Sequence, residues 1–163
     1  MSEAEVHWRD FMESLQKRGL HGVEMVISDD HAGLGAARKA RLPGVPWQRC
    51  QFHLQQNAMG YLPRQEMRGP AARALRSVFD APDRKAADLR LAEVATSYRE
   101  TAPRFATWAE ENILQGLSIF SLPPAFDTRI PTAHQAWVPN HRISVACSLF
   151  VSLSIHRRPL TAR

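Results

Sequence analysis

The sequence predicts an α/β fold that continues into a block of helices. Val23–Ile27 is a short apolar run, rich in β-branched residues and bounded by polar ones, which is typical of a buried strand. Leu34–Leu42 contains three alanines, which favour a helix, and Pro43-Gly44 ends it. A second extended run, Val45–Phe52, comes next. The predicted order is therefore strand, helix, strand.

The residues before the first strand, 1–22, predict a helix. Apolar side chains recur there at roughly helical spacing. Ser2 and Glu5 have the spacing of a capping box, in which two side chains satisfy free N–H groups at a helix start. Gly19 stands where a C-terminal cap is expected, since glycine adopts left-handed backbone without strain.

Residues 54–117 predict an all-helical block. Pro70 fits the first turn of a helix, Asp83 is expected to cap a second helix over Arg84–Glu100, and Pro103 to open a third. The arginines of this block could line a DNA backbone, or they could form a solvated face balanced by acids. These arginines are Arg64, Arg68, Arg73, Arg76 and Arg84.

Composition bounds the class of protein. The chain has 163 residues, of which 44% are hydrophobic and 23% charged, as in an ordinary globular domain. Its net charge of +5 favours nucleic acid or another anionic partner. Only two cysteines are present, and we find neither a secretory leader nor an apolar run long enough to span a membrane. We therefore expect a reduced, cytoplasmic protein without a membrane partner.

Two aspartates and a histidine follow the first predicted strand, at the end where α/β sheets collect ligands. Asp29, Asp30 and His31 could bind a hard cation such as Mg²⁺, which prefers carboxylate oxygens. Alternatively, they could form an Asp-rich turn or helix start, in which side-chain oxygens accept hydrogen bonds from backbone N–H groups. Spacing alone leaves both interpretations open.

Cys50 and His53 supply two of the four ligands that a structural zinc requires, and no other pair has ligand spacing. We therefore favour a buried cysteine and a capped histidine at the end of the second strand. A cysteine–histidine nucleophile pair is disfavoured, because no third group is identifiable that would orient the histidine.

Two ordered blocks carry a family resemblance. Ser-Asp-x-His-x-Gly-Leu and Trp-Gln-Arg-Cys-x-x-His resemble the core of mutator-type bacterial insertion-sequence transposases. The signature residues are Ser28, Asp29, His31, Gly33, Leu34, Trp47, Gln48, Arg49, Cys50 and His53. The resemblance implies a ribonuclease-H-like domain in which two Asp and one Glu hold Mg²⁺ or Mn²⁺ for DNA strand cleavage and transfer. Asp29 matches the second catalytic Asp, whereas Asp30 falls on a variable position.

The resemblance also implies a division of the chain. Residues 1–53 would be a partial ribonuclease-H-like core (helix-strand-helix-strand), 54–117 a helical insertion, and 118–163 a degenerate, poorly ordered tail. In the family, strands bearing the first Asp precede the N-terminal helix, and we find none before Ser2. The expected parallel strands would therefore have open edges. The family's catalytic Glu lies in an Asn-x-x-Glu motif, yet no Asp or Glu follows Asp127.

We hypothesise that the tail is translated out of frame after about Phe126. The loss of acids and the run Ala133–Trp137 motivate this, because a one-base shift could restore the Asn-x-x-Glu motif. The encoding DNA tests the idea, which fails if no shifted frame contains the motif. A divergent C-terminal domain is the alternative. Val145–Ile155 is apolar and β-prone, as aggregating segments are.

The sequence thus leaves two main hypotheses for function. In the first, the chain is a transposase fragment that acts on transposon ends and target DNA but is inactive alone, since one carboxylate cannot hold two metal ions. In the second, it is a non-catalytic DNA-binding or regulatory fragment that associates with full-length transposase or with itself. A small α/β domain with an acidic turn is a third reading. Neither hypothesis assigns the residues that contact DNA.

Overall fold

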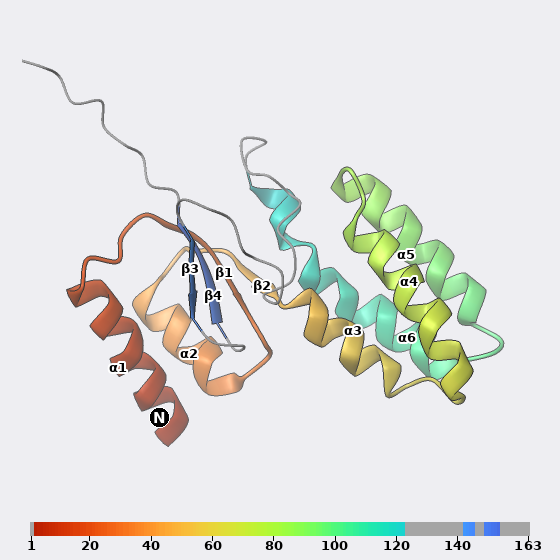
Figure 1. Cartoon of the computed structure of the whole chain (residues 1–163), viewed down its shortest axis with the longest axis horizontal. Helices are drawn as coiled ribbons and strands as arrows, with labels where there is room; N and C mark the ends of the chain where they lie inside the picture. Colours follow the sequence, from red (N-terminus) through yellow and green to blue (C-terminus); the bar gives the residue numbers. More distant parts are fainter. Residues whose placement is uncertain (1, 123–141, 146–148, 154–163) are drawn as a thin grey trace, which may run out of the picture. The chain divides into compact units, whose positions relative to one another are not determined.

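The computed structural model describes residues 2–122, 142–145 and 149–153. The chain forms two compact units, shown in Figure 1. Unit 1 comprises Met1–Trp47 and Trp137–Arg163, and unit 2 comprises Gln48–Ala136. Each unit has a buried apolar cluster of its own. No helix in the described part of the chain is both long and apolar enough to cross a membrane.

Unit 1 begins with α1, Glu3–Lys17, which confirms the predicted N-terminal helix. The Ser2 side chain caps it by accepting a hydrogen bond from the Glu5 backbone N–H at 3.2 Å. Gly19 follows the helix with φ of +98°, in the left-handed region that ends many helices. Sequence therefore located both ends of this helix to within a few residues.

The predicted strand, helix and strand are all present. They are β1 (Val23–Ser28), α2 (Ala32–Arg41) and β2 (Trp47–Arg49). β2 lies beside β1 in parallel and is shorter than predicted. The extended run does not reach Phe52, because helix α3 begins at Gln51. The coarse α/β prediction is confirmed.

Two short segments of the tail also belong to the sheet. β3 spans Arg142–Val145 and β4 spans Leu149–Leu153, and the sheet order is β2-β1-β4-β3. β4 runs antiparallel to β1, so the β1 edge that we expected to be open is paired. A strand within the β-prone run agrees with its composition. The tail that we predicted to be poorly ordered therefore contributes these two segments to the sheet, and for residues 123–141, 146–148 and 154–163 the prediction lies outside the described residues.

The core of unit 1 holds α1 and α2 against β1. Met12, Val26, Leu34 and Ala37 are its buried residues. Gly33 permits the close approach of the two helices, because a Cβ at that position would lie 3.0 Å from the Glu5 backbone nitrogen. The signature glycine Gly33 thus has a packing role.

From Gln51 to Ser121, unit 2 consists of helices and 3₁₀ turns joined by loops, as predicted for residues 54–117 (Figure 1). The Asp83 side chain accepts from the Ala86 N–H at 2.7 Å, which confirms the predicted cap. Pro70 lies near the start of its helix and Pro103 begins another, also as predicted. The helices are α3 (Gln51–Met59), α4 (Arg68–Phe79), α5 (Arg84–Tyr98) and α6 (Pro103–Asn112), with short 3₁₀ turns η1 (Gln65–Met67), η2 (Ile113–Gly116) and η3 (Ser118–Ser121).

Fully buried side chains from all four helices and η2 form the core of unit 2. Leu54, Leu75, Phe105 and Ile113 are among them. Gly116 is packed so tightly that an added Cβ would lie 2.7 Å from Leu54. The segment after α6 is thereby fixed against α3, which bears directly on the signature residues described below.

Candidate functional site

Asp29 lies where the sequence predicted, directly after β1 and before α2. The residue is partly buried, and its Oδ1 is inaccessible to solvent. Within the described residues this oxygen has no hydrogen-bond partner. A buried polar atom without a partner costs about 1–3 kcal/mol, so such atoms are uncommon and call for an explanation.

A hydrogen-bonded relay joins the two signature blocks next to Asp29. The indole Nε1–H of Trp47 donates to Ser28 Oγ at 2.8 Å. The Ser28 hydroxyl in turn donates to the Asp29 backbone carbonyl, also at 2.8 Å. Because Ser28 is buried, this relay fixes the backbone from which the Asp29 carboxylate projects. Trp47 and Ser28 are therefore positioning residues for Asp29.

Arg38 supports the same tryptophan from α2. Its guanidinium carbon lies 5.9 Å from the centre of the Trp47 ring, within the range of a cation–π contact. Its Nη1 donates to the Val45 carbonyl at 3.1 Å, which holds the chain leading into β2. Burial lowers the pKa of Arg38, because removal of water disfavours the charged form.

His31 serves as a helix cap, whereas the local alternative had assigned such a role to side-chain oxygens. Its Nδ1 accepts a hydrogen bond from the Leu34 N–H at 3.3 Å, at the start of α2. Asp30 is exposed, whereas Leu34 is buried in the core. Of the three polar residues after β1, Asp29 alone has a buried oxygen without a partner among the described residues.

Gln48 and Arg49 belong to unit 2, where both are buried and bind the segment after α6. The Gln48 Oε1 accepts from the Ile119 backbone N–H at 2.8 Å. Arg49 Nη1 donates to Gln115 Oε1 at 3.3 Å. These partners lie far along the chain, so a single sequence gave no sign of them. Both signature residues thus stabilise the helical unit.

Cys50 directly follows β2 and is buried, as predicted, whereas His53 does not lie at the strand end. Cys50 is buried at the residue before α3, and His53 lies in the first turn of that helix. The prediction for His53 failed because the extended run is short and the helix starts earlier than expected. His53 Nδ1 is buried without a hydrogen-bond partner in the described part of the chain, so the predicted capping of His53 is not observed there. Those residues contain no cluster of three or more His, Cys, Asp or Glu that could hold a metal ion.

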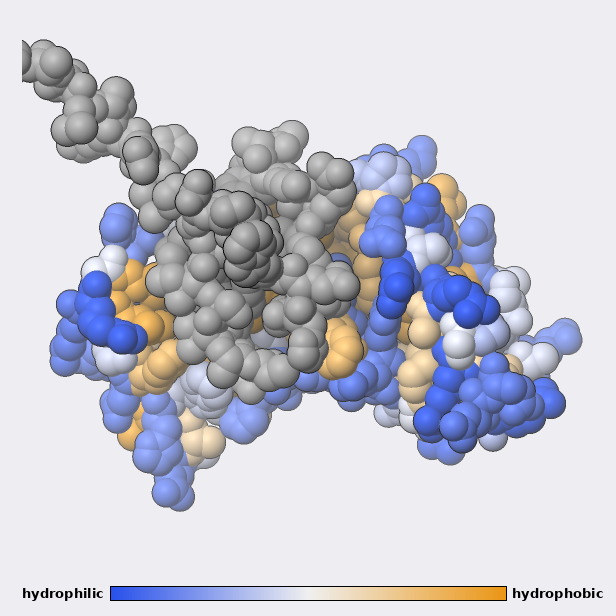
Figure 2. All heavy atoms as spheres, in the orientation of Figure 1, coloured by the Kyte–Doolittle hydropathy of each residue, from blue (hydrophilic) through white to orange (hydrophobic). Residues whose placement is uncertain are grey.

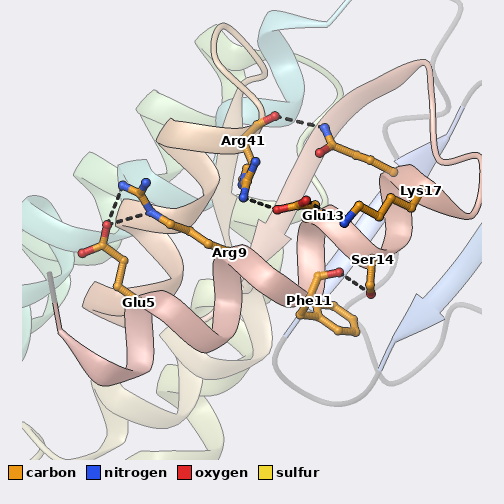
Figure 3. Close-up of polar contacts among 8 residues, drawn as sticks. Glu5, Arg9, Phe11, Glu13, Ser14, Lys17 and Arg41 are labelled. Atoms are coloured by element: carbon orange, nitrogen blue, oxygen red, sulfur yellow. Dashed lines mark hydrogen bonds and ion pairs between the residues drawn. The ribbon is translucent and has the colours of Figure 1, made fainter.

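Ion pairs, shown in Figure 3, join α1 to itself and to α2. Glu13 pairs with Lys17 at 2.8 Å and with Arg41 of α2. The hydrogen bond from Lys17, with the positive charges of Arg41 and Lys17, lowers the pKa of Glu13. Arg9 and Glu5 form a further pair at 2.7 Å. These pairs hold the helices that flank the strand preceding Asp29.

Comparison with known families identifies the chain. The model of the family described as Transposase, Mutator family matches residues 1–143. The chain belongs to this family. The match runs to residue 143, past Phe126, the point after which we hypothesised an out-of-frame tail.

Curated insertion-sequence transposases are similar to most of the chain. The transposase for insertion sequence element IS406 of Burkholderia multivorans is 51% identical over 133 residues, which cover 82% of this chain and 34% of the relative. The transposase for ISRM5 of Rhizobium meliloti is 41% identical over 121 residues, covering 74% and 30%. The transposase for IS1081 of Mycobacterium tuberculosis is 38% identical over 100 residues, covering 61% and 24%. The chain thus spans about a third or less of the length of these relatives.

Proposed function

We propose that the chain is the part of an insertion-sequence transposase that carries one carboxylate of its metal site for DNA strand cleavage and transfer. That carboxylate is Asp29, acting as a ligand of Mg²⁺ or Mn²⁺. The buried Oδ1 of Asp29, left without a hydrogen-bond partner in the described residues, is the observation that carries the proposal. A divalent cation would satisfy this oxygen. Glu24 Oε2 is also buried without a partner in the described residues, but Glu24 lies within β1, whereas Asp29 follows its carboxyl end, where α/β sheets collect ligands.

The residues around Asp29 fit such a role. Carboxylate oxygens are the hard ligands that Mg²⁺ prefers, and Mg²⁺ retains several waters and needs only one or two protein carboxylates. When bound, the metal would stabilise negative charge on the phosphate oxygens of DNA. Trp47 and Ser28 contribute by fixing the Asp29 backbone through their hydrogen bonds. His31 contributes by capping the helix that follows.

We further propose that β1, α2 and β2 are the second half of a ribonuclease-H-like core. The parallel strand pair and the position of Asp29 at the carboxyl end of β1 support this, because that end of an open α/β sheet collects catalytic groups. In this proposal the DNA partners are transposon ends and target DNA. Association with a second copy or with full-length transposase would supply additional carboxylates.

The isolated 163-residue chain is proposed to be inactive in strand transfer. A two-metal site needs several carboxylates, and the described residues bring together no group of three potential ligands. No Asp or Glu follows Asp127 in the sequence. Incubation of the pure chain with supercoiled plasmid and Mg²⁺ or Mn²⁺ should therefore leave the plasmid intact, and nicking that Asp29→Ala abolishes would refute this part of the proposal.

Metal binding at Asp29 is tested by paramagnetic broadening of backbone amide signals. On titration with Mn²⁺, the signals of Ser28, Asp30 and His31 should broaden first. The Asp29→Asn variant should lose this selective broadening. The Asp10→Asn variant removes an exposed carboxylate from α1 of the same unit and makes the same charge change, so it should retain the broadening. Equal broadening in the wild type and Asp29→Asn would show that Asp29 is not a ligand.

A further inference from the structure

Helix α4 presents a face whose only charges are positive. Arg68, Arg73 and Arg76 are all exposed, and the twelve residues of the helix include no Asp or Glu. The opposite face of α4 is apolar and is buried in the core of unit 2. Packing of that face fixes the orientation of the helix, so these arginines stay exposed to solvent. At about 1.5 Å rise per residue, the first and last of the three lie about 12 Å apart along the helix.

Helix α5, packed beside α4, adds a fourth arginine to this face. The Nη1 of Arg90 donates to the Ser77 carbonyl at 2.6 Å, which places its guanidinium at the C-terminal end of α4. In Figure 2, the most hydrophilic residues gather over the area where Figure 1 shows α4 and α5. We call Arg68, Arg73, Arg76 and Arg90 the α4 arginine face.

Ion pairing distinguishes these arginines from three other arginines of unit 2. Arg84 pairs with Asp88 at 2.8 Å, Arg99 with Glu110 at 2.8 Å, and Arg64 with Glu66 at 3.8 Å. Within the described residues, no carboxylate lies within ion-pair distance of the α4 arginine face. Asp80 ends α4 one turn beyond Arg76, yet the two do not pair. The sequence analysis placed Arg64 and Arg84 in one group with the arginines of α4. In the structure Arg64 and Arg84 have acidic partners, whereas the α4 arginines have none in the part of the chain that is described.

We propose that the α4 arginine face binds the phosphate backbone of duplex DNA without reading its sequence. This rests on the proposed function, which names DNA as the partner. Guanidinium groups match phosphate oxygens as bidentate donors, and a row of them along one helix can reach successive phosphates of a strand. A face already balanced by its own acids would gain little from DNA, whereas an uncompensated face exchanges counterions for phosphates.

The test measures DNA affinity against salt concentration for the complete 163-residue chain. The probe is a fluorescently labelled duplex of arbitrary sequence, in EDTA, so that metal binding at Asp29 has no influence. The test variant carries Arg68→Gln, Arg73→Gln and Arg76→Gln. The control variant carries Arg64→Gln, Arg84→Gln and Arg99→Gln, three exposed arginines that have acidic partners. Both variants lose the same formal charge.

Loss of three phosphate contacts should reduce the slope of log affinity against log salt by about 2.7. Between about 50 and 200 mM salt, the wild type should therefore lose about 40-fold more affinity than the test variant does. The control variant should keep a slope within about one unit of the wild type. Replacing the same three α4 arginines with lysine keeps their charge, so the slope should largely be retained. Removing Arg90 from the test variant should lower the slope by about one further unit.

Several results would overturn the proposal. Equal losses in the test and control variants would mean that net charge alone attracts DNA. If the wild type did not bind duplex DNA at low salt, the α4 arginine face would not be a DNA-binding surface. The separate Mn²⁺ test of Asp29 would not be affected by that result. Binding of an acidic polypeptide as tightly as duplex DNA would make the partner a protein. If the glutamine variant fails to fold by circular dichroism, each single Arg→Gln change is measured instead, and each should reduce the slope by about one unit.

Discussion

The relay from Trp47 through Ser28 to Asp29 predicts that the first two residues stabilise unit 1 cooperatively. Trp47→Phe removes the indole donor but keeps an aromatic ring close to Arg38. Ser28→Ala removes the acceptor at a position that is only 4% exposed. The 2.8 Å separation of Trp47 Nε1 and Ser28 Oγ is that of a well-formed hydrogen bond.

The size of the effect follows from what each substitution leaves behind. A hydrogen bond of this kind contributes about 1 kcal/mol net to the free energy of unfolding. Ser28→Ala also removes the bond to the Asp29 carbonyl and leaves the partly buried indole N–H without its acceptor, so we expect a loss of about 2 kcal/mol. Trp47→Phe should cost about 1–2 kcal/mol, since it also removes buried apolar surface. The double variant should lose about 1 kcal/mol less than the two losses combined.

Urea unfolding followed by far-ultraviolet circular dichroism measures these free energies without relying on tryptophan fluorescence. The control cycle pairs Trp47→Phe with Ser14→Ala, because the Ser14 hydroxyl bonds only within α1, to the Phe11 carbonyl. The control pair should be additive to within about 0.5 kcal/mol. Additivity of Trp47→Phe with Ser28→Ala would show that the relay does not form, and the positioning role assigned to both residues would fall with it.

Three further outcomes are expected. Gln48→Leu should lower stability by about 1–3 kcal/mol in urea unfolding, because it leaves the buried Ile119 N–H without an acceptor; an unchanged midpoint would contradict this. Gly33→Ala should cost about 1–3 kcal/mol, since its Cβ would meet backbone atoms of α1, and Gly35→Ala, where no atom lies within 4 Å, is the matched control. Glu13, whose pKa is lowered chiefly by its hydrogen bond to Lys17, contributes stability above its ordinary value of 4.5 that is lost as pH falls through the lowered pKa. Thermal unfolding of the wild type and Glu13→Gln should therefore converge on acidification below 4.5, and a constant difference would refute the assignment.

Local signals in the sequence were sufficient for most helices. Three helices begin at residues that act locally, through their own backbone or side chain: Ser2, Asp83 and Pro103. Such local effects can be predicted without knowledge of the tertiary structure. The boundary between β2 and α3 was missed for the opposite reason. The run from Val45 to Phe52 is apolar enough for a strand, but Gln48 and Gln51 bind backbone groups near residues 116–119, and that long-range pairing accompanies an early helix start.

The candidate site was predictable in part. The position of Asp29 after β1 follows from the apolar run that precedes it, and the structure agrees. The roles of the other signature residues were not predictable from type or spacing. Trp47 could have been a core residue or a binding residue, and only its 2.8 Å contact with Ser28 shows that it positions the Asp29 backbone. Likewise, nothing in the sequence separated the paired Arg84 from the unpaired Arg76.

These geometries assign several signature residues to building the fold. Gly33 provides space, His31 uses a ring lone pair as a helix cap, and Gln48 satisfies a buried backbone N–H. Asp29 differs in its chemistry: its buried Oδ1 makes no hydrogen bond within the described residues and, unlike the similarly unpartnered Nδ1 of His53, belongs to a carboxylate, which is a hard ligand for cations. Substitution of the first group should therefore change stability before function. A buried oxygen without a hydrogen-bond partner lowers the stability of the folded chain. Proteins tolerate such a loss of stability at binding sites, where the group is needed for a ligand.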